Sequence, residues 1–350
     1  MRHLNNPVNL IFLSLFSLAF VSMAAAQTIC PPPALPTFSA THDRPGVYQE
    51  CGTKTIQNSA GEHVVVGYEG NLQNSYNALY FVRFDATGQT IGDKNEISFV
   101  ESGALWSLYE GQPVHLLKET QLIEVLSNNQ PDGYLVAVTA EQVGATPDVL
   151  LVRLDQEGCV VWTRRIAEGG LQIPVGLFQN AAGEFLVFVA NDIGGDRFLT
   201  LFTVDDSGTL VQGNEYRAAP SIDFNAVSVK QWPGSGFSAP VYAVLGQLSV
   251  LNPATTQTYV SLLAIDGNYQ VVQNRFTRYD WDFTLSDSDE TPVDLEPNGS
   301  SLVMTGQLQS GAGSRLFLLS TDPFAVGPTL LPTVDYNYIF DFNDAENEMA

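Results

Sequence analysis

Apolar segments that end in the same polar turn recur along this chain. Each segment is rich in Leu, Val and Phe and is followed by Asp, two further residues and Gly. Short apolar runs of this composition, bounded by Gly and Asp, are typical of β-strands. In the turn, Asp accepts backbone N–H bonds and Gly supplies a positive φ, so Asp85, Asp155 and Asp205 are expected to be structural. The three copies occupy residues 79–88, 149–158 and 198–208.

A second turn and strand precede each copy. In this first half, Asn or Asp stands shortly before a Gly, and a strand rich in Val, Leu and Phe follows. Each repeat is therefore expected to hold two strands joined by a polar loop. A shortened turn at Asp266-Gly267, after residues 260–265, marks a fourth copy. The strands expected from the first halves lie at 62–67, 134–138, 184–189 and 300–306.

The spacing of the turns predicts the architecture. The turn glycines at 88, 158, 208 and 267 are separated by 70, 50 and 59 residues. A four-stranded antiparallel sheet with its loops needs about 60 residues, and sheets of this kind stacked radially leave few exposed edges. We therefore predict an all-β fold, a β-propeller of five to six four-stranded blades with little helix. A β-solenoid or a pair of β-sandwiches is the alternative.

The chain divides into four segments. Residues 1–26 form a secretory signal, because an apolar run at 10–21 leads to three alanines that place the cleavage near Ala26/Gln27. The run is too short for a comfortable membrane span, so we expect a secreted or periplasmic protein without a span after cleavage. The other segments are residues 27–55, a candidate ring-closing strand, residues 56–333, the propeller repeats, and residues 334–350, an acidic tail or closing strand.

Charge and composition narrow the partners. The chain has 38 acidic and 15 basic residues and a net charge of −23, so it should repel nucleic acids and anionic membranes. A hydrophobic content of 45% argues against disorder. The expected partner is an extracellular ligand, either a protein, a peptide or a glycan.

Three cysteines remain after the signal. Cys30 and Cys51 lie close enough in the N-terminal segment to be a candidate disulfide, which leaves Cys159 over. Cys159 follows a turn glycine at the start of a strand and is expected to be a small packed side chain. No His stands in a motif that would make it a partner for a catalytic Cys.

One stretch carries a family resemblance. Residues 155–164 contain the Asp-x-x-Gly turn, then three residues, Trp162, and a basic residue shortly after. This order resembles the blade repeat of bacterial secreted propellers of the quinoprotein-like (PQQ-like) type, and of exported repeat proteins common in Bacteroidota. The resemblance spans most of 56–325. In quinoprotein propellers a Trp recurs in every blade and docks neighbouring sheets, whereas 89–92 and 209–212 lack it here. The resemblance therefore implies the architecture and not pyrroloquinoline quinone binding.

One acidic segment is a candidate metal site. Ca²⁺ accepts six to eight oxygen ligands in loose geometry, and a dense run of carboxylates could supply them. The run lacks the spacing of an established calcium loop, so a solvated acidic loop is the alternative. Its candidate ligands are Asp280, Asp282, Asp287, Asp289 and Glu290.

No catalytic motif is visible. The chain has no G-x-S-x-G, H-E-x-x-H or C-x-x-C sequence. The sequence therefore predicts a non-catalytic binding or scaffold module with no cofactor other than the candidate calcium. The alternative is a secreted glycoside hydrolase or lyase that uses acidic residues in the propeller channel, and a quinoprotein relative is a third option.

Overall fold

The computed structural model is an all-β molecule. It describes residues 48–71, 76–98, 114–142, 145–218, 222–232, 241–251, 256–272, 277–279, 289–299, 301–310, 313–322 and 333–341. Within these residues, no helix has the length and hydrophobicity to cross a membrane.

Five antiparallel sheets of four strands make up the fold, and each is built from one continuous stretch of chain. Blade 1 contains β1 (Tyr48–Gln57), β2 (His63–Asn71), β3 (Tyr76–Phe84) and β4 (Thr90–Ser98). Blade 2 contains β5 (Val114–Ser127), β6 (Gln130–Gln142), β7 (Asp148–Leu154) and β8 (Val160–Ile166). Blade 3 contains β9 (Leu171–Gln179), β10 (Phe185–Ile193), β11 (Asp196–Val204) and β12 (Leu210–Tyr216). Blade 4 contains β13 (Ile222–Trp232), β14 (Val241–Leu251), β15 (Thr256–Ile265) and β16 (Thr277–Tyr279). Blade 5 contains β17 (Asp289–Asn298), β18 (Ser301–Ser310), β19 (Gly313–Asp322) and β20 (Thr333–Asp341).

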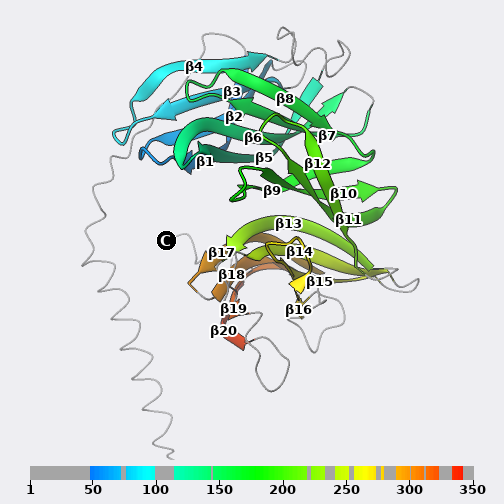
Figure 1. Cartoon of the computed structure of the whole chain (residues 1–350). Coiled ribbons are helices and arrows are strands. Elements are labelled where there is room, and N and C mark those ends of the chain that lie inside the picture. Colours follow the sequence, from blue (N-terminus) through cyan, green and yellow to red (C-terminus); the bar gives the residue numbers. More distant parts are fainter. Residues whose placement is uncertain are drawn as a thin grey trace, which may run out of the picture.

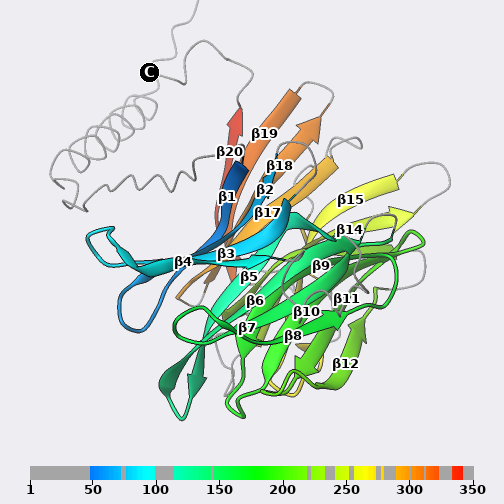
Figure 2. The same cartoon turned by 90° about the horizontal axis from the view of Figure 1, so that it is seen from above.

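The sheets follow one another in chain order around a common centre (Figures 1 and 2). The first strands of neighbouring blades contact each other, as β1 does with β5, β5 with β9, β9 with β13 and β13 with β17. The first strand of each blade is therefore the innermost. The prediction of a β-propeller is confirmed, and the number of blades is five.

The core lies between the blades. Along β6, Tyr134, Val136 and Val138 pack into the cluster shared with blade 1, while Leu135 and Ala137 pack into the cluster shared with blade 3. Successive residues of a strand point to opposite faces of the sheet, so both faces are buried. This is why the second and third strands of each repeat read as continuous apolar runs rather than as alternating ones. Similar clusters join blade 3 to blade 4 and blade 4 to blade 5.

The recurring Asp stabilises its turn, as the sequence predicts. The Oδ1 atom of Asp155 accepts the backbone N–H of Glu157 at 3.0 Å and of Cys159 at 2.8 Å. The backbone N–H of Gly158 donates to the carbonyl oxygen of Asp155 at 3.1 Å, and this glycine has φ 87°. The turns at Asp85 and Asp205 have the same bonds, so these aspartates are structural.

The fourth turn differs from its expected form. Asp266 accepts N–H bonds from Asn268 and Gln270, so the turn is of full length and is not shortened at Gly267. Tyr269 occupies the glycine position with φ 63°, which is uncommon for a residue with a bulky side chain. Its position is held from blade 3, because the Tyr216 hydroxyl donates to the Tyr269 carbonyl oxygen at 2.9 Å.

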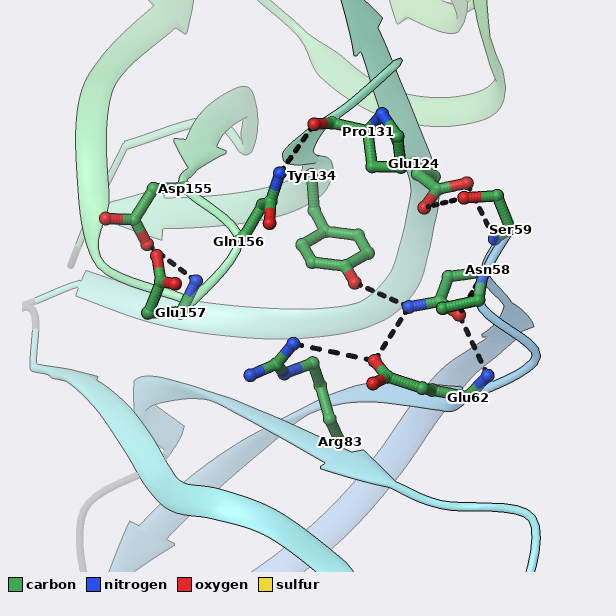
Figure 3. Close-up of polar contacts among 11 residues, drawn as sticks. Asn58, Ser59, Glu62, Arg83, Glu124, Pro131, Tyr134, Asp155, Gln156 and Glu157 are labelled. Carbon is green, nitrogen blue, oxygen red and sulfur yellow. Dashed lines mark hydrogen bonds and ion pairs between the residues drawn. The ribbon is translucent and has the colours of Figure 1, made fainter.

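A repeated polar contact joins neighbouring blades on this turn face. In blade 1, Asn58 Nδ2 donates to Glu62 Oε2 at 2.9 Å and to the Tyr134 hydroxyl of blade 2 at 3.0 Å (Figure 3). In blade 3, Asn180 Nδ2 donates to Glu184 Oε2 at 2.8 Å and to the Tyr269 hydroxyl of blade 4 at 3.0 Å. The same Asn-x-Ala-Gly-Glu turn therefore contacts a tyrosine of the next blade twice. Burial raises the pKa of Tyr134, which keeps its hydroxyl protonated.

Trp162 joins blade 2 to blade 3. Its indole Nε1 donates to the carbonyl oxygen of Asp206 at 2.8 Å, and its ring lies 6.2 Å from that of Phe185. A Cβ atom at Gly208 would lie 3.0 Å from the indole ring, so the glycine allows the ring to approach the turn. The docking role that the resemblance gives to this Trp is what Trp162 performs between these two blades.

We expect Asn180→Asp to weaken the contact between blades 3 and 4. The substitution keeps the Oδ1 acceptor for the turn but removes the two Nδ2 donations and places a second carboxylate beside Glu184. Loss of the paired donors should lower the free energy of unfolding by about 1–3 kcal/mol at pH 7, measured by urea denaturation. Asp205→Asn is the control, because this turn side chain bonds only within its own turn among the described residues. Equal losses in the two variants would contradict an inter-blade role for Asn180.

Candidate functional site

A β-bulge interrupts each innermost strand near its middle. The register against the second strand skips one residue in β1, β9, β13 and β17, and it shifts between Leu116 and Thr120 in β5. A bulge leaves one residue unpaired and re-aims the side chains next to it. The residues directly after the four single-residue bulges are Lys54, Gly176, Ser228 and Asp294.

All five innermost strands contribute to one cavity of about 270 Å³. Its polar side chains come from four blades, whereas β9 contributes an apolar wall. Strands distant in sequence therefore meet at the centre of the ring. The lining residues are Lys54 of β1, Gln121 and Leu122 of β5, Val175, Leu177 and Phe178 of β9, residues 227–230 of β13, and Val293 and Asp294 of β17.

Asp294 is the most firmly oriented carboxylate at this cavity. Its Oδ1 atom accepts the Ser228 hydroxyl at 3.0 Å and the backbone N–H of Leu295 at 2.8 Å. Lys230 Nζ lies 3.9 Å from the same oxygen. Within the described residues, no hydrogen bond reaches Oδ2, so this oxygen is available to a bound molecule.

Glu296 adds a second carboxylate two residues further along β17. Its Oε1 atom forms an ion pair with Lys230 of blade 4. The side chain of Glu296 is 62% exposed, while that of Lys230 is only 26% exposed. The innermost strands run toward the turn face, so Glu296 lies nearer to that face than Asp294 does.

Lys54 approaches the same charges from blade 1. Burial lowers its pKa, and the like charge of Lys230 lowers it further, while Asp294 and Glu296 oppose the shift. Among the residues the structure describes, the ammonium group of Lys54 has no hydrogen-bond or ion-pair partner within 4.0 Å. Its ammonium group is thus partly desolvated without a partner, an arrangement found at binding and catalytic sites more often than on ordinary surfaces.

A larger cavity of about 900 Å³ opens on the turn face and shares Phe178 with the central one. Four of the five carboxylates in its lining, those of Glu124, Asp132, Glu184 and Asp205, are engaged in contacts within the protein. Glu124 accepts the backbone N–H and the hydroxyl of Ser59 (Figure 3), and Glu184 accepts Asn180. We therefore regard the larger cavity as the entrance and the central one as the candidate site.

The side chains of the predicted calcium ligands lie outside the described residues. Asp280, Asp282 and Asp287 lie outside the described residues, and Asp289 and Glu290 begin β17 with side chains that are also outside them. In the described part of the chain, no group of three or more His, Cys, Asp or Glu residues could hold a metal ion. Calcium binding by this segment stays a prediction.

The cysteine expectations have different outcomes. Cys30 lies outside the described residues, so its disulfide with Cys51 stays a prediction. Cys159 is free and exposed, and the expectation that it would be packed is wrong. The residue is exposed because the turn that precedes it places it at the start of β8, the outer strand of blade 2.

The sequence did contain a signal for the central cavity. The motifs Pro-Val-Gly-Leu, Ala-Val-Ser-Val and Pro-Val-Asp-Leu begin at residues 174, 226 and 292 and are copies of one bulge. Their third position is the residue that follows the bulge. The motif is hard to recognise because its third position, the one that lines the cavity in two of the copies, holds a different residue each time: Gly176, Ser228 or Asp294.

Comparisons with known proteins give a likeness of fold. No protein-family model and no curated protein matches the chain. A putative exo-β-1,3-galactanase from Bifidobacterium bifidum is similar at 14% identity, with a TM-score of 0.43, over 81% of this chain and 89% of that one. An α-L-arabinofuranosidase from Fusarium graminearum is similar at 8% identity, with a TM-score of 0.48, over 82% and 92%. An exo-β-1,3-galactanase from Clostridium thermocellum is similar at 11% identity, with a TM-score of 0.40, over 83% and 66%.

These matches correct the functional expectation from the sequence. The similar solved structures are glycoside hydrolases, so the reading of the chain as a non-catalytic binding or scaffold module is wrong. At these identities the likeness concerns the fold alone.

We expect Lys54→Met to change how stability depends on pH. A Lys whose pKa is lowered by folding is protonated more readily in the unfolded chain, so the free energy of unfolding rises with pH toward the unfolded value of 10.5. The variant should be more stable than the parent at pH 7, and this advantage should shrink at pH 10. Urea denaturation of both proteins at the two pH values measures the difference.

The control is Arg164→Met, which removes one positive charge from the exposed outer strand β8. Its stability difference from the parent should not change between pH 7 and pH 10 as that of Lys54→Met does, because the Arg164 side chain is exposed rather than partly buried. A pH-independent difference for Lys54→Met would contradict the desolvated state of Lys54.

Proposed function

We propose that the protein is an exported glycoside hydrolase that cleaves its substrate in the central cavity of the propeller. The observation that carries the proposal is the carboxylate of Asp294 in the lining of the central cavity, beside lysines of two other blades. Glu296, two residues further along the same innermost strand, supplies a second carboxylate outside the lining. Glycoside hydrolysis needs two carboxyl groups at the scissile bond, one of which donates a proton while the other acts as base or nucleophile.

Asp294 is proposed as the base or nucleophile. Ser228 and the Leu295 N–H hold its Oδ1, which leaves Oδ2 directed at a sugar carbon or a water molecule. A carboxylate held in one orientation needs little reorganisation during the reaction.

Glu296 is proposed as the proton donor. As the bond from the glycosidic oxygen to the anomeric carbon breaks, the leaving oxygen takes a proton from Glu296, whose ion pair with Lys230 must open first so that Glu296 can be protonated. Water then supplies the new oxygen at the anomeric carbon, and its proton passes to a carboxylate. Before the substrate binds, Lys230 contacts both side chains and holds the two carboxylates close to each other.

The location and cofactor content are part of the proposal. A signal at residues 1–26 would deliver the enzyme to the periplasm or the medium, where glycans are encountered. Calcium at residues 280–290 would be structural, since Asp294 and Glu296 supply the chemistry. The resemblance to quinoprotein-like blades rests on the Asp-x-x-Gly turns and on Trp162, which are structural. The proposal therefore includes no quinone cofactor.

The substrates to test first are β-1,3-galactan, arabinan and xylan, and aryl glycosides of their sugars. We expect Asp294→Asn to lower kcat at least 10³-fold on every substrate that the parent cleaves. Glu296→Gln should lose activity on glycans but keep much of it on aryl glycosides with a good leaving group, because these need no proton donor. Product release measured by reducing-end assay and by aryl absorbance checks both results.

Glu157→Gln serves as the control and should leave activity unchanged, because Glu157 lies in the turn between β7 and the outer strand β8 and does not line the central cavity. If Asp294→Asn keeps the activity of the parent, the assignment of the site fails. If the parent releases no product from any of these glycans or glycosides, the proposed function fails.

A further inference from the structure

The two lysines at the central cavity are unusual for this chain. Only four of its 350 residues are lysine, and the net charge is −23. Lys54 and Lys230 nevertheless come from blades 1 and 4 to line the same cavity. Two of the four lysines of this acidic chain therefore lie at one cavity, and their charge makes that cavity less attractive to cations than the rest of the protein.

The two lysines differ in what they contact. Lys230 is paired with Glu296 and approaches Asp294, so its charge is largely used within the protein. The ammonium group of Lys54 faces the cavity without a hydrogen-bond or ion-pair partner among the described residues. Burial and the charge of Lys230 disfavour the ammonium form of Lys54, and Asp294 and Glu296 offset this only in part, so a further anion bound beside Lys54 would stabilise its charge.

We propose that Lys54 binds the carboxylate of a uronate unit, which makes the substrate an acidic glycan. The inference rests on the proposed function, because it assigns the substrate class of the same cavity. In the six-membered ring of a uronate, the ring oxygen is bonded to two carbons. One of them is the anomeric carbon, and the other carries the carboxyl group. A sugar ring seated between Lys54 and Asp294 therefore offers its carboxylate to the ammonium group and its anomeric carbon to Asp294 Oδ2.

The rest of the cavity suits one such ring. A volume of about 270 Å³ is close to the lower limit for ligand pockets, which fits a single monosaccharide unit. Gln121 lies in the same lining and its Nε2 already donates to the Pro174 carbonyl oxygen at 3.3 Å, which holds the amide in place beside the ring. Val175, Leu177 and Phe178 form an apolar wall against which the carbon face of a sugar can pack.

The binding of a uronate to the central cavity can be measured directly, without an assay of hydrolysis. Isothermal titration with galacturonate and glucuronate, and with galactose, glucose and inorganic sulfate as probes, compares the parent with Lys54→Met and with Arg164→Met. We expect one of the uronates to bind the parent, and Lys54→Met to weaken it about 10- to 100-fold, as the loss of a charge-assisted contact would. Arg164→Met, which changes the net charge equally, should bind as the parent does.

Proton uptake gives a second readout that a merely structural lysine would not change. An anion beside Lys54 favours its ammonium form, so binding at pH 9 should take up protons, seen as a dependence of the binding heat on the buffer. The uptake should be absent from Lys54→Met. Equal binding of uronates and neutral sugars, or binding of sulfate in place of uronate, overturns the proposal.

The two proposals can fail separately. Uronate binding that depends on Lys54, in a protein that releases no product from any glycan, would leave the inference standing and reject the hydrolase. Cleavage of neutral glycans that needs Asp294, in a protein that does not bind uronates, would support the hydrolase and reject Lys54 as a uronate contact.

Discussion

The burial of both faces of the middle strands is the constraint on which this structure depends. The second strand of a blade places alternate residues against two different neighbours, so a blade removed from the ring would expose apolar side chains on both sides. Hydrophobic burial therefore stabilises pairs of blades rather than single blades. The turn contacts of Asn58 and Asn180, and the indole of Trp162, add directional bonds to this non-directional attraction.

The innermost strands meet a different requirement. They have a partner on one side only, and their bulges place polar residues next to the axis of the ring. The second and third strands of the blades supply most of the apolar core. The bulge positions of the innermost strands can therefore hold polar side chains without disrupting that core. The ring can hold Lys54, Ser228 and Asp294 at its centre while the cores between the blades stay apolar.

Sequence reasoning recovered the part of the fold that repeats. The Asp-x-x-Gly turns and the apolar strands before them are local signals, and they were sufficient to predict a propeller, although five blades could not be told from six. Tyr269 was missed because a residue held by contacts from blade 3 replaced the glycine that marks the turn. The central cavity was missed for a related reason, since a bulge breaks the alternation of a strand and the residue after the bulge differs between copies, as Gly176, Ser228 and Asp294 do. Cys159 shows that a position after a turn does not by itself decide burial.

Each blade is made from one uninterrupted stretch of chain, and this has a consequence for biosynthesis. None of the five sheets in the described part of the chain must wait for a strand from the opposite end of the polypeptide, so hairpins can form in sequence as the chain leaves the ribosome. Each new blade would then cover the apolar face that the previous one leaves exposed. The last surface to be covered belongs to the newest blade, and a chaperone or the completed ring must protect it until synthesis ends.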